Sequence, residues 1–72
     1  MTLKLRALLS IIDNGTSGAK EEAAAALYNL SNNGDNKSVI RKSGLDMITN
    51  AYENESNNTI KNELNDLLDR IK

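Results

Sequence analysis

Apolar side chains recur along the chain at the three- and four-residue spacing that places them on one face of an α-helix. Asp, Asn, Gly and Ser interrupt this pattern at residues 13–15, 32–34 and 43–44, and a polar stretch interrupts it again at 53–58. Pro, which would break a helix from within, does not occur in the sequence. We therefore predict five helices, at residues 3–12, 17–31, 35–42, 45–52 and 59–72.

Capping residues suggest where some of these helices begin and end. Asp35 or Asn36 can cap the third helix, because a short polar side chain accepts a hydrogen bond from a free backbone N–H group. Asn14 or Gly15 can end the first helix by adopting the left-handed conformation. Ser43–Gly44 is expected to turn the chain between the third and fourth helices.

The first and last predicted helices differ in the width of their apolar faces. The last helix carries one apolar stripe, formed by Ile60, Leu64, Leu67, Leu68 and Ile71, and the rest of its surface is polar. The first helix carries a main row, formed by Leu5, Leu8, Leu9 and Ile12, and an adjoining row, formed by Leu3, Ala7 and Ile11. One of these two rows is left without a partner inside the chain.

An internal repeat relates the two halves of the sequence. A shift of about 41 positions, a period typical of helical repeats, aligns the second predicted helix with the fifth. A shift one residue shorter aligns the first with the fourth, so the extra residue falls in a loop. The aligned pairs include Ala19 with Ile60, Glu22 with Glu63, Ala23 with Leu64, Leu27 with Leu68, Leu30 with Ile71, Leu5 with Leu45, Leu8 with Ile48 and Ile12 with Tyr52.

The composition limits how the fold can be stabilised. At 72 residues the chain can form one small domain, and without Cys or His it has no disulfide and no thiolate or imidazole zinc ligand. Phe and Trp are also missing, so the core is expected to be aliphatic, with Tyr28 and Tyr52 at its edge. Neither a metal nor a cofactor is expected.

Charge and hydropathy narrow the classes of partner. A net charge of −1, with basic and acidic residues interspersed, argues against a nucleic-acid binder. Apolar runs are too short to span a membrane. The apolar stretch at residues 7–12 does not fit a signal peptide, because it is short, is interrupted by Ser10 and lacks a small-residue cleavage site. We therefore expect a cytoplasmic or nuclear protein that is not secreted.

The sequence contains no catalytic motif. A nucleophile would have to be a Ser, Thr, Lys or carboxylate activated by its neighbours, and neither a nucleophile elbow nor a phosphate-binding loop is present. We therefore expect no enzymatic activity and assign no catalytic residue.

The central stretch resembles the armadillo repeat. The residues that carry the likeness are AKEEAAAALYNLS at 19–31, DNKSVI at 35–40 and Gly44-Leu45. The resemblance implies an all-α, right-handed α-solenoid fragment of five helices, which are the second, third, first, second and third helices of successive repeats. It covers residues 1–72 as one domain, with a partial repeat at about 1–32 and a second, cap-like repeat at about 35–72. The Pro often found early in the second helix of the family is missing.

The resemblance also implies that the protein functions as a protein-protein interaction module. In the family the third helices line a concave groove that holds an extended peptide, and an Asn on that helix binds the peptide main chain. Asn29 matches that Asn, Ala25 stands where the nuclear-import receptors have Trp, and Asp66 and Arg70 are the equivalents one repeat later. The slot that Trp makes for basic side chains is therefore not expected.

Alternatives remain open for these residues. Glu22 could join Glu21, Asp66 and Asp69 in an acidic lining that attracts basic peptides, or all four could belong to a solvated helix face. Asn29 could instead be a solvated helix residue or a brace to a neighbouring loop. Asp66 and Arg70, one turn apart, are expected to form a weak surface ion pair.

A second interaction surface is expected at the first helix. Repeats bury their apolar faces against neighbours, so the row of Leu3, Ala7 and Ile11 is expected to stack on preceding repeats or on a second copy of the chain. The alternative to a binding module is a purely structural piece, such as a capping segment or a minimal or engineered armadillo fragment, which self-associates and has no ligand of its own.

Overall fold

The protein consists of four α-helices joined by short connections. In the computed structural model the backbone is described for residues 2–72 and the side chains for residues 4–72. The helices are α1 (Thr2–Asn14), α2 (Ser17–Leu30), α3 (Gly34–Asn54) and α4 (Asn58–Ile71). The expected all-α class is confirmed within the described residues, whereas the expected number of helices is wrong.

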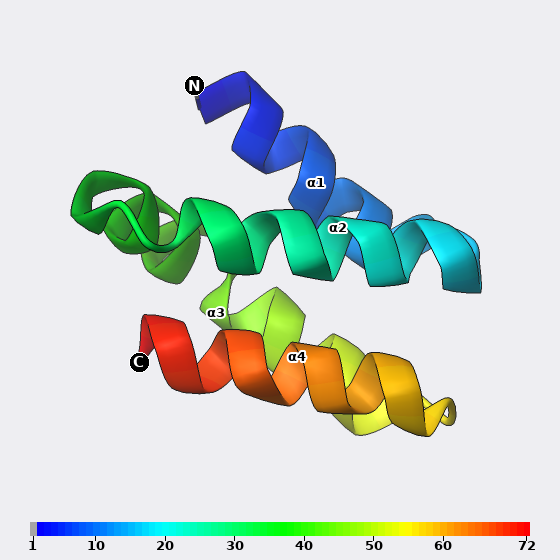
Figure 1. Ribbon diagram of the computed structural model, residues 1–72. Coiled ribbons are helices and arrows are strands. Elements are labelled where there is room, and N and C mark those ends of the chain that lie inside the picture. Colours follow the sequence, from blue (N-terminus) through cyan, green and yellow to red (C-terminus); the bar gives the residue numbers. More distant parts are fainter. Residues whose placement is uncertain (1) are drawn as a thin grey trace.

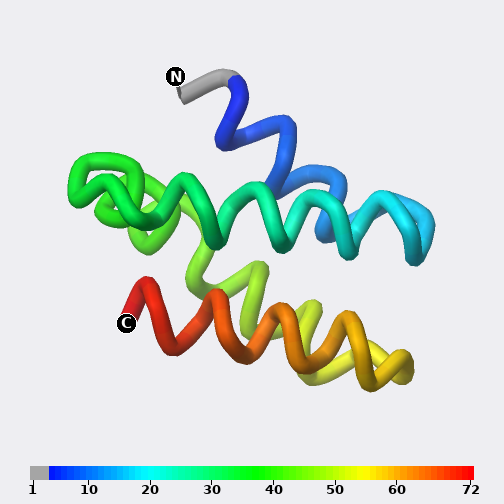
Figure 2. Tube along the Cα trace, viewed as in Figure 1, coloured from blue at the N-terminus to red at the C-terminus, as the bar shows by residue number. Residues whose placement is uncertain are grey.

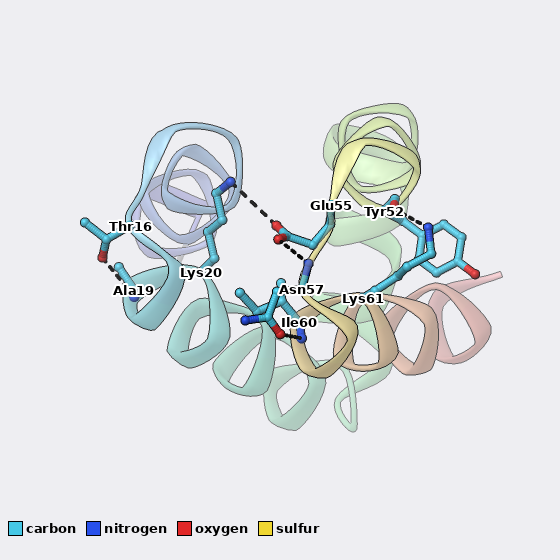
Figure 3. A network of polar contacts seen from close by, with 8 residues as sticks. All are labelled: Thr16, Ala19, Lys20, Tyr52, Glu55, Asn57, Ile60 and Lys61. Atoms are coloured by element: carbon cyan, nitrogen blue, oxygen red, sulfur yellow. Dashed lines mark hydrogen bonds and ion pairs between the residues drawn. The ribbon is translucent and has the colours of Figure 1, made fainter.

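The helices form two layers. Figures 1 and 2 show α2 and α4 side by side and running in the same direction, with α1 and the second half of α3 behind them. The end-on view of Figure 3 separates the same layers, with α1 and α3 above α2 and α4. Within this arrangement α1 packs on α2 and α3, and α4 packs on α2 and α3. The described part of the molecule measures 30 × 21 × 18 Å along its principal axes.

An aliphatic core fills the space between the layers. Its largest fully buried side chains are Ile12, Leu27, Ile40, Ile48, Ile60, Leu64, Leu67 and Ile71. Burying one such side chain contributes roughly 1.5–3 kcal/mol before the loss of conformational entropy is subtracted. All five residues of the stripe predicted on the last helix are buried, and Tyr28 and Tyr52 pack against the edge of the core as expected.

The third and fourth predicted helices are one continuous helix. The turn expected at Ser43–Gly44 lies inside α3, although the path of the helix bends near its middle (Figures 1 and 2). Gly44 is buried against α1, and a Cβ atom placed on it would lie 2.5 Å from Leu9 Cδ2. Gly disfavours a helix by only about 1 kcal/mol relative to Ala, and close packing with α1 offsets this cost. Tertiary contact therefore overrides the local signal.

Three polar side chains cap the helices. Thr16 accepts a hydrogen bond from the backbone N–H of Ala19 at the start of α2, and Asn57 does the same for α4. Asn33 caps α3, so the expectation of Asp35 or Asn36 at this position is wrong. No described residue has a positive φ, so the left-handed end expected for α1 at Asn14 or Gly15 is also wrong. Each cap of this kind contributes about 1 kcal/mol.

Polar contacts hold the connection between α3 and α4 at one end of the molecule, and one of them joins it to α2 (Figure 3). Lys20 on α2 lies 3.7 Å from the carboxylate of Glu55, in the connection between α3 and α4. Lys61 on α4 donates a hydrogen bond to the backbone carbonyl of Tyr52 and lies 4.1 Å from the centre of its ring. These contacts fix the connection that carries the Asn57 cap.

The close approach at Gly44 can be tested by substitution. We expect Gly44→Ala to lower the free energy of unfolding by about 1 kcal/mol, because the cost of overpacking Leu9 exceeds the gain in helix propensity. Gly18→Ala is the matched control: a Cβ there meets no atom within 4 Å, so this change should stabilise the protein by about 0.5 kcal/mol. Urea denaturation followed by circular dichroism measures both.

A double-mutant cycle with Leu9→Ala isolates the contact, since removal of the Leu9 side chain should make Gly44→Ala neutral or stabilising. Equal stabilisation by Gly44→Ala and Gly18→Ala in the wild-type background would show that the helices do not approach closely at Gly44.

Candidate interaction groove

A groove of about 350 Å³ lies between α2 and α4, and its lining residues all come from these two helices. Its walls combine small apolar residues, an aromatic ring, an amide and two carboxylates. The lining residues are Ala24, Ala25, Tyr28, Asn29, Glu63 and Asp66. A second depression continues from it and is lined by Tyr28, Asp66, Asp69 and Arg70. The two depressions share Tyr28 and Asp66, so they form one surface, which we call the α2–α4 groove.

Helical spacing brings these side chains to the groove. Ala25, Tyr28 and Asn29 lie three and four positions apart on α2, and Glu63, Asp66 and Arg70 do so on α4. Between them Ala24 is fully buried, and its small side chain allows the two helices to pack closely. The groove is therefore shallow, and its floor is formed by the helix contact itself.

The structure brings together four of the five residues predicted to bind a partner. Ala25, Asn29 and Asp66 line the main part of the groove, and Arg70 lines its continuation. Glu22 is exposed on α2 and lines neither part.

Arg70 makes a different contact from the one expected. Its guanidinium group lies 5.0 Å from the centre of the Tyr28 ring, so it bridges α4 and α2 by a cation–π contact. The ion pair predicted between Asp66 and Arg70 does not occur, since the only ion pair among the described side chains joins Lys20 and Glu55.

Glu63 is the groove residue that the sequence did not single out. Burial raises its pKa above the ordinary value of 4.5, and the carboxylates of Glu21 and Asp66 raise it further. A side-chain contact with Glu21 acts in the same direction. The spacing of Glu63 and Asp66 on one helix could have been noticed, but the approach of Glu21 depends on how α2 and α4 pack.

The groove offers hydrogen bonding and charge. The exposed amide of Asn29 has both a donor and an acceptor, and the carboxylates provide a negative potential beside it.

No group of three or more acidic, His or Cys side chains that could hold a metal ion occurs in the described part of the chain. Among the described residues, no helix has the length and apolar character needed to cross a membrane.

The residues predicted to form the stacking surface differ in how far they are exposed. Ala7 is exposed on α1, and Ile11 is half-buried at the edge of the core. The side chain of Leu3 lies outside the described residues.

Comparisons of the chain with protein-family models, with curated proteins and with solved structures found no match. The functional interpretation therefore depends on the geometry of the surfaces described above.

The carboxylates of the groove give stability a specific pH dependence. Because the folded-state pKa of Glu63 is raised, the folded protein binds protons more tightly than the unfolded chain, and stability is lost as the pH rises through that pKa. Glu63→Gln removes this penalty and keeps helix propensity. We expect the variant to be more stable than the wild type at pH 7 by ~0.3 kcal/mol, and this advantage to disappear below pH 4.5.

Glu22→Gln is the matched control, because it removes the same charge from an exposed position that lies outside the groove. Urea denaturation at a series of pH values measures the difference, which should shrink with added salt. An equal effect of the two substitutions at every pH would mean that Glu63 and Glu21 do not interact.

Proposed function

We propose that this protein is a protein-protein interaction module, not an enzyme, and that its α2–α4 groove binds an extended peptide. The observation that carries the proposal is the exposed amide of Asn29 in a groove between two parallel helices, beside the carboxylates of Glu63 and Asp66. An amide in this position can donate to and accept from the main chain of a peptide, whatever the side chains of that peptide.

The fold that we propose for this role is a right-handed α-solenoid fragment of the armadillo type. Two features support it: the sequence repeat relates α2 to α4, and these helices lie parallel and side by side. The bend of α3 is a further support, because its two parts match the expected short first helix and the second helix of one repeat. On this basis α1 and α2 are the partial repeat, and α3 and α4 are the second repeat.

The charge of the groove favours a basic peptide. The carboxylates of Glu21 and Asp66 lie close enough to Glu63 to disfavour its charged form, and a Lys or Arg side chain of a ligand would relieve that repulsion. Ala25 leaves room for such a side chain on the apolar wall, without the aromatic slot of the import receptors. Arg70, over the ring of Tyr28, limits the acidic region at one end.

A peptide titration tests this function. Two unstructured peptides that differ only in having Lys or Glu at alternate positions should be added to the protein labelled with ¹⁵N. We expect the Lys peptide to shift the side-chain amide of Asn29 and the backbone signals of Tyr28 and Asp66, and the Glu peptide to bind more weakly. Asn29→Ala should weaken binding of the Lys peptide about fivefold, the scale of one hydrogen bond.

Asn65→Ala is the control, because Asn65 is an exposed Asn on α4 that does not line the groove. It should leave the affinity unchanged. Shifts with neither peptide would reject the proposal and favour the purely structural role, and shifts confined to other helices would reject the groove as the binding surface.

A further inference from the structure

A half-buried apolar surface covers the end of the molecule formed by α1 and α2. On α2 it consists of Ala19, Ala26 and Leu30, which helical spacing places on the side opposite the groove residues Ala24 and Tyr28. On α1 it consists of Leu8 and Ile11, which lie opposite the residues facing α3. We call these five residues the N-terminal face. All five are half-buried, so each remains partly open to solvent.

The second half of the chain shows what such a surface becomes when it is covered. The sequence repeat aligns residues of the N-terminal face with residues of α3 and α4. The aligned pairs are Ala19 with Ile60, Ala26 with Leu67, Leu30 with Ile71 and Leu8 with Ile48. The second member of each of these four pairs is 0% exposed, because α1 and α2 pack over that part of α3 and α4. The fifth residue, Ile11, aligns with Ala51, which is half-buried. The N-terminal face is thus the same kind of surface without its covering helix pair.

The end of the molecule formed by α3 and α4 is poorly suited to pack on the N-terminal face of a second copy. Where one helix pair packs on the next, Ala24 is 0% exposed and Leu9 is 3% exposed. The aligned positions one repeat later are Asn65, which is exposed, and Thr49, whose hydroxyl is already bonded to the carbonyl of Leu45. A second copy stacked head to tail would place these polar groups against an apolar surface, at a desolvation cost. In a contact between the N-terminal faces of two copies, the apolar residues defined above would meet each other.

We infer that two copies of this chain associate through their N-terminal faces, related by a two-fold axis. A two-fold contact requires a surface that complements itself, and an apolar patch with small residues meets this requirement. Ala19 and Ala26 allow the α2 helices of the two copies to approach closely. The exposed charged residues one turn away are of opposite sign, Lys4 on α1 and Glu22 on α2, so the contact brings no surplus of like charge.

This association is independent of the proposed peptide binding. Asn29 and Asp66 line a groove between α2 and α4, whereas the N-terminal face lies on the side of α2 away from α4. Both grooves therefore stay open in the pair. Loss of one property would leave the other measurable.

Neighbouring alanines of α2 provide a matched test. Ala26→Glu places a charge in the centre of the N-terminal face, and Ala25→Glu places the same charge in the groove, with equal effects on helix propensity and net charge. Sedimentation equilibrium over a range of concentrations should give a mass of two chains for the wild type and for Ala25→Glu. Ala26→Glu should weaken the association roughly 100-fold or more, because two unpaired charges would be buried.

Circular dichroism and thermal unfolding establish whether each variant is folded. If Ala26→Glu does not fold, Leu30→Gln at the end of α2 removes apolar area with little strain and should still weaken the association. A wild-type protein that sediments as one chain at every concentration overturns the inference. So does equal weakening by the Ala25 and Ala26 substitutions, or an assembly that grows beyond two chains, which would indicate head-to-tail stacking.

Discussion

The packing of the α1–α2 pair against the α3–α4 pair is the interaction on which the rest of the molecule depends. It is made at two close approaches, where Ala24 is completely buried near α4 and Gly44 lies against Leu9. A chain of 72 residues with no Cys has a small core, so it has little stability to spare and must bury aliphatic area efficiently. The two helix pairs therefore share one core and are not two independently stable parts.

The same packing creates both the groove and its electrostatic cost. Parallel alignment of α2 and α4 brings Asn29 beside Asp66, and it also brings Glu21 beside Glu63. A fold optimised only for stability would not hold the Glu63 carboxylate where burial and the neighbouring carboxylates of Glu21 and Asp66 disfavour its charged form. This cost at an exposed groove is one reason to regard it as a binding surface in the proposal above.

Much of the fold was predictable because it follows from local periodicity. The stripe of α4 repeats every three to four residues, so its burial could be inferred without knowing its neighbours. The continuity of α3 could not, because Ser43–Gly44 is a turn signal locally and is overridden by contact with Leu9. Capping by Asn33 was also missed, since several polar residues precede α3 and each could serve as the cap.

The groove was predictable only in part. The register of the repeat placed Asn29 and Asp66 on corresponding helices, and they do lie on one surface. The contact of Arg70 with Tyr28 and the proximity of Glu63 to Glu21 depend on the relative rotation of two helices, which periodicity within each helix does not determine. Sequence spacing thus identifies which side chains share a helix face, and packing decides which of them meet across helices.

Residue-resolved unfolding tests the shared core most directly. Amide signals of the ¹⁵N-labelled protein should be followed through a urea titration, at a concentration held constant so that any association stays the same. If the two helix pairs form one cooperative unit, amides of α1 and α2 and amides of α3 and α4 will lose their native signals at the same midpoint. Loss of the α1–α2 signals at a lower urea concentration, while α3 and α4 remain folded, would contradict this account.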